Sequence, residues 1–211
     1  MALPNPRPGE DTSDGSPAGQ NPPNLFNHPT AISLSATTMT TLRAFTTDDL
    51  FMFNGVNLDA LTETYNMGFY MGYIARWPEM CLVAEAASGD VAGYVLGKAE
   101  GSGELWHGHV TALTVSPTFR RQRLAERLMN FLEEVTEIKE GYFVDLFVRV
   151  SNAVAISMYE KFGYSVYRRV LQYYAGEEDA FDMRKAMSRD VGKKSVIPLT
   201  RPVRPDEIEF N

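Results

Sequence analysis

Arginine side chains gather at one point of the chain, at Arg120, Arg121 and Arg123. Apolar residues recur at four-residue steps from Leu124 to Leu132, a spacing that is typical of one face of a helix. The arginines therefore stand at a helix N-terminus, where unpaired backbone N–H groups and a partial positive charge suit an anion such as a pyrophosphate. On this pattern alone, an ordinary solvated basic turn fits the same residues equally well.

A tyrosine follows an asparagine at a spacing that suits chemistry on one helix face. Ser151 and Asn152 form a good helix cap, and Tyr159 lies seven residues, about two turns, beyond Asn152. The two side chains should project from roughly the same face, where a phenol can donate a hydrogen bond to a developing thiolate. Tyr159 also shares the apolar stripe of that helix, so a tyrosine packed in the core is the alternative interpretation.

Groups that can accept a proton occur at His109, in a β-branched run, and at Glu63, in an early connecting segment. Taken alone, a strand histidine more often faces solvent or pairs in the core, and a loop acid is usually solvated. His107 lies two residues from His109 and therefore on the same strand face. A zinc site would need two more ligands and none is evident in the sequence, so we expect no metal.

Strands and helices alternate in the middle of the sequence, with strand pairs toward both ends. Strands are expected at 40–45, 81–86, 91–98, in the run that ends at Ser116-Pro117, and at 142–150, 164–174 and 181–185. Helices are expected after Thr46 or Thr47, at 69–76, from Leu124 onward and from Asn152 to Gly163. This order predicts an α/β fold with a mixed, mostly antiparallel sheet flanked by helices.

The composition is that of one globular α/β domain with tails, since the chain has 211 residues of which 44% are hydrophobic. No apolar run is long enough to span a bilayer. The net charge of −7 argues against general binding of nucleic acid. The single cysteine, Cys81, excludes an internal disulfide and fits a reducing compartment, and its apolar strand predicts that it packs in the core.

The two ends of the chain differ from its middle. Residues 1–38 are rich in proline and glycine and hold few large apolar residues, so we expect them to be disordered. They lack the basic start and apolar centre of a signal peptide, and their three acidic residues against one arginine argue against a transit peptide. Residues 188–211 are charged and interrupted by prolines, which predicts an extended tail, either mobile or lying as a strap on the domain or a partner.

The arginine loop, the strand after it and the helix that carries Asn152 and Tyr159 resemble the GNAT acetyltransferase superfamily, whose pyrophosphate loop has the form Arg/Gln-x-x-Gly-x-Gly/Ala. Six ordered blocks between about Met39 and the C-terminus are similar to the catalytic subunits of NatB N-terminal acetyltransferases: LTETYNMGFYMGYIARWPE, WHGHVTALTVSP, YFVDLFVRVSN, MYEKFGYSVYRRVLQYY, DMRKAMSRD and KKSVIPL. The loop departs from the superfamily at Arg123, which stands in place of the first glycine. With a negative φ, Arg123 would still offer the same backbone N–H, so we expect cofactor binding to survive.

The resemblance implies a GNAT acetyltransferase domain over residues 39–187 that binds acetyl-CoA between splayed central strands. Backbone groups of the central strand would pair with the pantetheine arm, and the arginine loop would hold the pyrophosphate. The expected cofactor contacts are Leu113, Thr114, Val115, Arg120, Arg121, Gln122, Arg123, Leu124, Ala125, Asn152 and Tyr159. Tyr159 would stabilise the leaving thiolate, and His109 or Glu63 would take the proton of the amine or orient it.

The resemblance further implies acetylation of the α-amine of nascent chains that begin Met-Asp, Met-Glu, Met-Asn or Met-Gln. An α-amine titrates near ~7.7–8.0, so about a quarter is neutral around pH 7.4, against about one in a thousand for a lysine side chain. An α-amine therefore needs only mild help from a base. The expected substrate contacts are Glu63, Tyr65, His109, Thr111, Phe147, Asn152, Tyr173 and Tyr174.

A partner is implied as well, namely a large helical-repeat auxiliary subunit that anchors a cytoplasmic enzyme at the ribosome, without direct contact to nucleic acid or membrane. Apolar residues of the first two helices, such as Phe51, Phe53 and Tyr70, would contact it if they are exposed. Two alternatives stay open. One is a GNAT enzyme that acetylates lysine or a small amine, and the other is a cofactor-binding but inactive subunit, suggested by Arg123.

Overall fold

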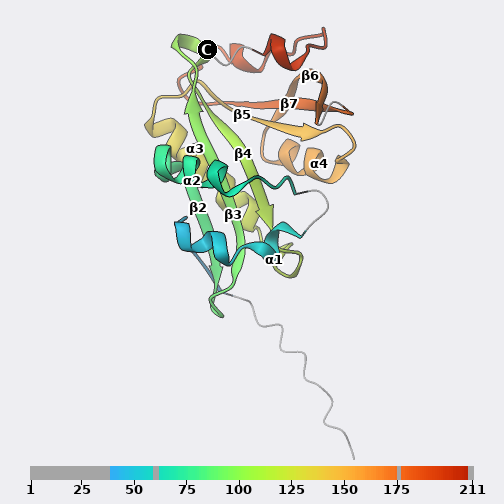
Figure 1. Ribbon diagram of the computed structural model, residues 1–211. Coiled ribbons are helices and arrows are strands. Elements are labelled where there is room, and N and C mark those ends of the chain that lie inside the picture. The colour runs from blue at the N-terminus through green and yellow to red at the C-terminus, as the bar shows by residue number, and fades with distance from the viewer. Residues whose placement is uncertain (1–38, 59–61, 175–176, 209–211) are drawn as a thin grey trace, which may run out of the picture. The chain divides into compact units, whose positions relative to one another are not determined.

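The computed structural model describes residues 39–58, 62–174 and 177–208, which belong to one compact unit (Figure 1). The N-terminal extension that we expected to be disordered, residues 1–38, lies outside the described residues. So do Leu61, in the early connecting segment, and the last residues of the tail, 209–211. Among the described helices, none is long and apolar enough to cross a membrane.

A seven-stranded mixed sheet forms the centre of this unit, in the order β1-β2-β3-β4-β5-β7-β6. Its strands are β1 (Thr40–Ala44), β2 (Cys81–Ala86), β3 (Val91–Glu100), β4 (His107–Val115), β5 (Phe143–Arg149), β6 (Ser165–Tyr174) and β7 (Glu178–Ala186). Every neighbouring pair is antiparallel except β4 and β5, which run parallel. The predicted mixed, mostly antiparallel sheet is confirmed.

The α-helices of the described residues are α1 (Asn54–Asn57), α2 (Met67–Arg76), α3 (Leu124–Ile138) and α4 (Ala153–Lys161). The helix expected after Thr46 is different from the prediction, because the chain forms a 3-10 turn at Thr47–Phe51 and then the short α1. Asn54 and Gly55, poor helix formers, make up the first half of α1, which spans only four residues. Gly163, with φ 92°, ends α4 as predicted.

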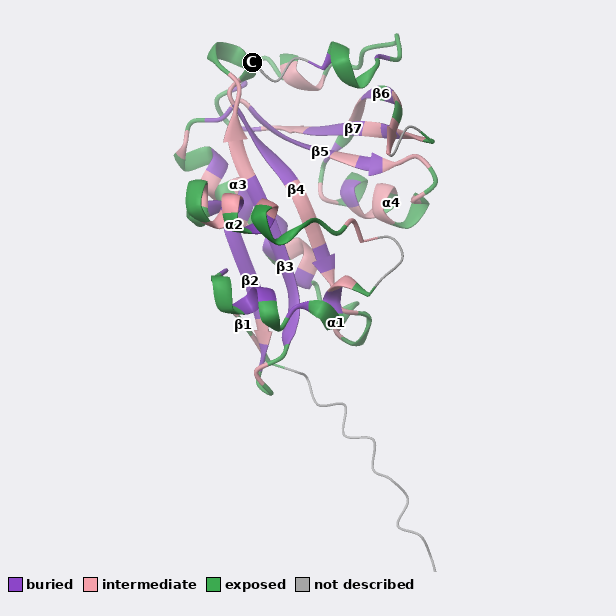
Figure 2. Cartoon of the chain, in the orientation of Figure 1, coloured by how far each residue is buried: buried purple, intermediate pink, exposed green. Residues whose placement is uncertain are grey.

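Two apolar cores lie on opposite faces of the sheet. On one face, Leu128 and Leu132 of α3 pack with Val95 of β3 and Tyr159 of α4. On the other face, α1, α2 and the 3-10 turn pack over β2 and β3, with Tyr94 buried among them. Adjacent residues of β3 therefore pack in different cores, because successive side chains of a strand point to opposite faces of the sheet. Figure 2 shows the central strands buried and the outer surfaces of the helices exposed.

The two parallel strands separate partway along their length. β4 pairs with β5 from His107–Phe143 to Val110–Leu146. Beyond these residues β4 continues to Val115 alongside β3, without a recorded pair to β5 in the described residues. The sheet thus opens at its centre, as the splayed-strand prediction requires.

Close packing of α3 decides which way the histidines of β4 face. A Cβ at Gly108 would collide with the side chain of Thr136 in α3. Gly108 therefore faces α3, and His107 and His109 on either side of it point to the opposite face, toward α2. The prediction that the two histidines share a strand face is confirmed.

Candidate active site

A pocket lies where β4 and β5 separate, bounded by the segment before α2, by α4 and by the end of β6. It brings together most of the residues that the sequence analysis singled out: Glu63, Tyr65, His109, Thr111, Leu113, Thr114, Phe147, Asn152, Tyr159, Tyr173 and Tyr174. The arginine loop, which lies beyond the end of β4, is not among the lining residues. The pocket also includes Phe69, Tyr73, Lys98 and Arg149, which sequence reasoning had not selected.

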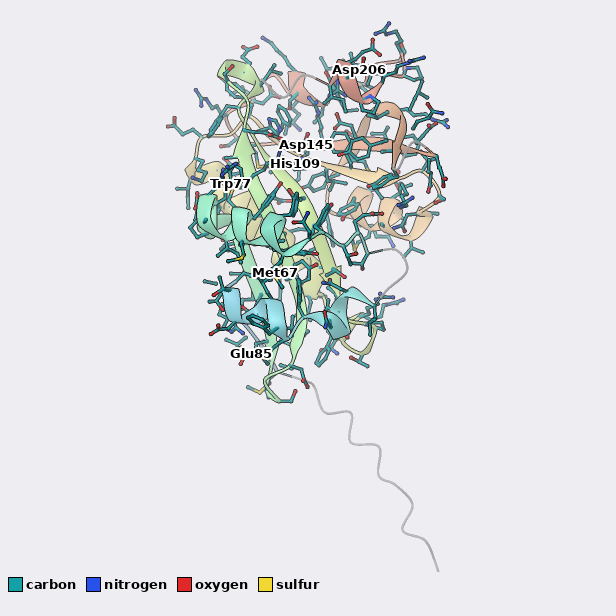
Figure 3. All side chains as sticks on the ribbon, in the orientation of Figure 1. Met67, Trp77, Glu85, His109, Asp145 and Asp206 are labelled. Carbon is teal, nitrogen blue, oxygen red and sulfur yellow. The ribbon has the colours of Figure 1, made fainter. Side chains whose placement is uncertain are left out.

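His109 is held by a buried carboxylate. Its Nδ1 lies 2.7 Å from Oδ1 of Asp145, and the two residues are direct neighbours across the parallel pair β4 and β5 (Figure 3). Burial by itself would raise the pKa of Asp145, but the charges of His109, His107 and Arg184, together with the hydrogen bond from His109, lower it to about 2. Asp145 therefore stays ionised and fixes the orientation of the imidazole ring.

His107 lies behind this pair, deeper in the sheet. Its Nδ1 is 2.6 Å from the carbonyl oxygen of Leu105, while Nε2 lies 3.5 Å from Oδ1 of Asp145 and 3.8 Å from Oε1 of Glu100. Among the described residues, Nε2 makes no hydrogen bond although it lies close to both carboxylates. The second histidine is thus part of the charge balance around Asp145.

The same cluster bears on the expectation that no metal binds. Among the described residues, Glu100 joins His107 and His109 as a third potential ligand, a residue that sequence reasoning had not found. However, the other oxygen of Glu100 accepts a hydrogen bond from the ammonium of Lys98 at 2.5 Å, and His109 is engaged by Asp145. Glu100 is already paired with the ammonium of Lys98, so the arrangement fits a hydrogen-bonded charge network better than a zinc centre.

Glu63 reaches the pocket but is occupied by an arginine. Nε and Nη2 of Arg149 donate to its Oε1 at 3.0 and 2.5 Å, and Nη1 of Arg149 donates to Glu178 at 3.0 Å. The guanidinium also lies 4.2 Å from the ring centroid of Tyr174. Arg149 therefore links the segment before α2 to the β6–β7 hairpin, and the expected solvated acid at position 63 is instead one arm of this clasp.

Tyr159 and Asn152 both line the pocket, as their spacing predicted. Asn152 is the N-cap of α4, and its side chain accepts a hydrogen bond from the Ala155 N–H at 3.1 Å. Tyr159 is buried, and burial raises its pKa well above the usual value, so the phenol keeps its proton and can donate a hydrogen bond. The core and the pocket interpretations of Tyr159 are both correct, because it packs against Phe162 and Tyr164 while facing the cavity.

Aromatic rings form one wall of the pocket. Phe147 stacks on Tyr173 with ring centroids 4.6 Å apart, and the hydroxyl of Tyr174 donates to the Phe147 carbonyl at 3.0 Å. Tyr65 stacks on Phe69 at 4.1 Å on the side of α2. Burial, and then the charge of Glu63, raise the pKa of Tyr65 to about 12. These rings give an apolar slot suited to an unbranched side chain such as methionine.

Two hydrogen bonds between side-chain hydroxyl groups connect β4 to α2 and to the segment before it. Thr111 donates to the hydroxyl of Tyr73 at 2.8 Å, and the hydroxyls of Thr114 and Thr62 lie 3.0 Å apart. Thr111 is also the residue at the bulge of β4, between the pairs Leu96–Ala112 and Gly97–Val110. The bulge turns polar groups of β4 toward the cavity.

The backbone conformation of the arginine loop differs from the expectation. Arg123 is the N-cap of α3 with φ 61°, a left-handed conformation, rather than the negative φ that we expected. Arg121 also has a positive φ of 64°. The loop thus keeps the shape that a glycine favours although arginine occupies it, and the exposed Arg123 side chain is tied to Glu126. Arg120 donates through Nε to the Val115 carbonyl at 3.2 Å, while Leu124 is buried at the start of α3.

The residues that sequence reasoning missed had weak signals. Asp145 is an acid within the near-continuous apolar strand 143–148, and such an acid calls for a buried partner. Phe69 and Tyr73 follow helical spacing and look like ordinary core residues. Arg149 carries no pattern of its own, since its partners Glu63 and Glu178 lie on other segments of the chain. Lys98 pairs with Glu100 on its own strand, a spacing that is common on exposed strands.

Comparisons with known proteins agree on one kind of relative. The model of the acetyltransferase (GNAT) family matches residues 47–164. The chain is 64% identical over 174 residues to the N-terminal acetyltransferase B complex catalytic subunit NAA20 of Arabidopsis thaliana, covering 82% of this chain and 100% of the relative.

Two solved structures are similar as well. The crystal structure of Chaetomium thermophilum Naa20 in complex with a bisubstrate analogue has a TM-score of 0.75 and 40% identity, over 79% of this chain and 97% of that one. A NatB acetyltransferase complex bound to CoA and MES includes a chain with a TM-score of 0.65 and 43% identity, over 70% of this chain and 99% of that one.

Proposed function

This chain belongs to the acetyltransferase (GNAT) family, and we propose that it is the catalytic subunit of a NatB-type complex, which transfers acetyl from acetyl-CoA to the α-amine of chains that begin Met-Asp, Met-Glu, Met-Asn or Met-Gln. The observation that carries this proposal is the opened β4–β5 gap, which has the Asp145-held His109 at its root and Tyr159 among its lining residues. The similarity covers the whole length of a NAA20 subunit, which supports the choice of an α-amine as acceptor.

The cofactor fits the open side of β4. The backbone groups of Leu113, Thr114 and Val115 pair with β3 on one side, and on the other side they face the gap where an extended pantetheine arm can bind as a strand would. The pyrophosphate is proposed to bind at the N-terminus of α3, beside Arg120 to Ala125, where backbone N–H groups and guanidinium groups favour an anion. When bound, acetyl-CoA supplies the activated thioester; the residues of this chain position it and handle the protons.

The base is His109 rather than Glu63 in this proposal. Asp145 fixes the imidazole through Nδ1 and stabilises the imidazolium that forms when Nε2 takes the proton of the amine, directly or through one water. Glu63 already accepts two hydrogen bonds from Arg149, which makes it a means of holding the pocket rather than a proton acceptor. Removal of that proton lets the amine nitrogen form its bond to the acetyl carbon while the carbon–sulfur bond breaks.

Tyr159 is the proposed donor to the departing sulfur. Its burial keeps the phenol protonated at every physiological pH, so it can offer an O–H to the thiolate as negative charge develops. Because this interaction strengthens only as the carbon–sulfur bond breaks, it lowers the barrier of the chemical step more than it assists cofactor binding.

We propose that two parts of the pocket select the first two residues of the substrate, an aromatic part for the first residue and a polar part for the second. Methionine is proposed to enter the slot formed by Phe147, Tyr173, Tyr174 and Tyr65. His109, Thr111 and Asn152, which line the same pocket, are proposed to read a carboxylate or amide in the second position. A buried polar group left without a partner costs ~1–3 kcal/mol, enough to disfavour an apolar second residue by about ten- to a hundredfold.

The auxiliary subunit is proposed to cover apolar residues near α1 and α2. Phe51, Met52, Met67 and Met71 are exposed there. Phe53 and Tyr70, which we had expected in this surface, are instead buried and contact each other at 5.1 Å in the core, so they are not part of it. A large helical-repeat partner on this surface would hold the enzyme at the ribosome in the cytoplasm, where nascent N-termini emerge.

The test is acetyl transfer by the complex of this chain with its auxiliary subunit, measured by mass spectrometry on peptides that begin Met-Asp, Met-Glu, Met-Leu and Ser-Ala. We expect the first two to react well above the others. Equal rates on all four peptides would reject the NatB specificity. Acetylation of an internal lysine in an N-terminally blocked peptide would favour a lysine acetyltransferase, and cofactor binding without transfer to any peptide would indicate an inactive subunit.

A further inference from the structure

The C-terminal segment from Lys194 to Ile208 is attached to the edge of the sheet, so of the two expected possibilities the strap is the one observed. β6 is the edge strand, and the Leu199 N–H donates to the Tyr167 carbonyl at 2.7 Å. Val203 donates to the Arg169 carbonyl at 3.0 Å and accepts from the Leu171 N–H at 2.8 Å, in a parallel bridge opposite Val170. Figure 1 shows this segment in red beside β6.

Both ends of the strap are fixed by polar contacts. At its start, the carboxylate of Asp190 accepts hydrogen bonds from the N–H groups of Lys194 and Ser195 at 3.0 and 2.8 Å. Near its end, Glu207 pairs with Arg201 and accepts from the Arg204 N–H at 2.8 Å. The strap therefore has a defined course before and after the bridge at Val203.

The apolar side chains of the strap pack behind the aromatic wall of the pocket. Val203 and Ile208 are 7% and 9% exposed and form a small core with Val170 and Ala180. Packed against this core are the three rings of the wall, Phe147, Tyr173 and Tyr174. The strap and the pocket thus share the same three rings.

The backbone that carries these rings is irregular. The register between β6 and β7 shifts between Val170 and Tyr174, and Gln172 has φ 52°. Tyr173 consequently has no partner in the β6–β7 ladder, whereas Tyr174 pairs with Glu178, so the position of the Tyr173 ring depends on what packs against it. Asp179 holds the irregular turn by accepting from the Gln172 N–H at 2.8 Å, and the strap supplies the apolar support.

We propose that Val203 and Ile208 are positioning residues for substrate selection, which act through Phe147, Tyr173 and Tyr174 to set the width of the slot for the first side chain of the peptide. The proposal rests on the proposed peptide acetyltransferase function of the pocket. Shortening either side chain leaves space behind the rings, so the rings shift back and the slot widens. The cofactor side of the pocket, at Leu113 to Val115 and α3, has no contact with this small core among the described residues.

The proposal predicts that substitutions in the strap change the KM for the peptide but not the KM for acetyl-CoA. In the complex with the auxiliary subunit, Val203→Ala and Ile208→Ala should each raise the KM for a Met-Asp peptide by about threefold or more and leave the KM for acetyl-CoA unchanged. They should also narrow the preference for Met over a bulkier first residue such as Phe. The matched control is Ile197→Ala, because Ile197 belongs to the same strap but is 60% exposed and should change none of these values.

A purely structural role would give a different result. Loss of folded protein lowers the apparent kcat for all peptides together and leaves both KM values and the first-residue preference as they were, which would overturn the proposal. A parallel rise of both KM values would overturn it too. Should Val203→Ala fail to fold, Ile208→Ala and the milder Ile208→Val, which both shorten a side chain of the same small core, give the same two comparisons. Absence of peptide acetylation by the unaltered complex would instead reject the proposed function itself.

Discussion

His109 Nδ1 lies 2.7 Å from Asp145 Oδ1, and the two residues are paired across the parallel strands β4 and β5, one residue before the last recorded pair, Val110–Leu146. The base proposed for the reaction is therefore anchored in the paired part of the sheet, at the point from which the two strands separate. The rigid part of the fold thus orients the imidazole, while the open part admits the substrates.

Replacing Asp145 with asparagine should lower kcat on the order of ten- to a hundredfold, because the amide cannot stabilise the imidazolium that forms on His109 as the proton moves. The measurement is steady-state kinetics with a Met-Asp peptide, and Asp90→Asn, in the exposed β2–β3 turn, is the control. Full activity of Asp145→Asn would mean that His109 does not accept the proton.

The same substitution should change the pH dependence of stability. The pKa of Asp145 is lowered from 3.8 to about 2 in the folded chain, so its contribution is complete above about pH 4 and is lost as the pH falls toward 2. Urea unfolding should show the Asp145→Asn chain to be less stable by about 2 kcal/mol near neutral pH. This difference should shrink between pH 4 and pH 2, because the carboxyl of the unfolded chain takes up a proton over that range while the carboxyl of the folded chain stays ionised. A constant difference across that range would contradict the lowered pKa.

Tyr159→Phe should reduce kcat strongly with little effect on the dissociation constant of acetyl-CoA, since the phenol acts when charge appears on sulfur. Cofactor titration and single-turnover transfer measure the two quantities separately. Tyr164→Phe is the matched control, because Tyr164 is also a buried tyrosine of this core but does not line the pocket. Weaker cofactor binding with unchanged turnover would assign the Tyr159 hydroxyl to binding.

Arg123→Gly should preserve activity and raise the Tm, by about 2–4 °C, because glycine adopts φ 61° without the steric cost that a side chain has there. Arg123→Ala is the informative control, because it removes the ion pair with Glu126 but keeps the strained conformation, so it should not be stabilised. Thermal unfolding monitored by circular dichroism compares the three chains. Loss of acetyl transfer in Arg123→Gly alone would show that the guanidinium itself holds the cofactor.

The sequence predicted the parts of the fold that local patterns encode. A nearly continuous apolar run marked β2 at 81–86, and the four-residue spacing after Leu124 marked α3. The backbone conformation of Arg123 could not be predicted, because φ there is set by the loop joining β4 to α3 and by the buried Leu124 behind it rather than by the preference of arginine. The expectation of a negative φ followed that preference and was wrong.

Prediction of the site was limited by contacts between distant residues. His109, Tyr159 and the aromatic residues were selected from their spacing and from a family resemblance, and they do line one pocket. Their partners come from elsewhere in the chain: Asp145 is 36 residues from His109, and Arg149 is 86 residues from Glu63. Only the strand register and the closure of the loops bring these pairs together, and neither is visible in a local pattern.

The two candidates for the base, His109 and Glu63, are separated by a double-substitution experiment on the clasp. If Glu63 serves to hold the pocket through Arg149, Glu63→Gln and Arg149→Gln should each raise the peptide KM with a small effect on kcat. The double variant should be no worse than Arg149→Gln alone, because that substitution already removes the interaction with Glu63. A Glu63 that accepts the proton would instead give a large fall in kcat for Glu63→Gln and a mild effect for Arg149→Gln. Glu178→Gln measures the second arm of the clasp, and it should weaken peptide binding less because its loop is also tied through the Tyr174 hydroxyl to the Phe147 carbonyl.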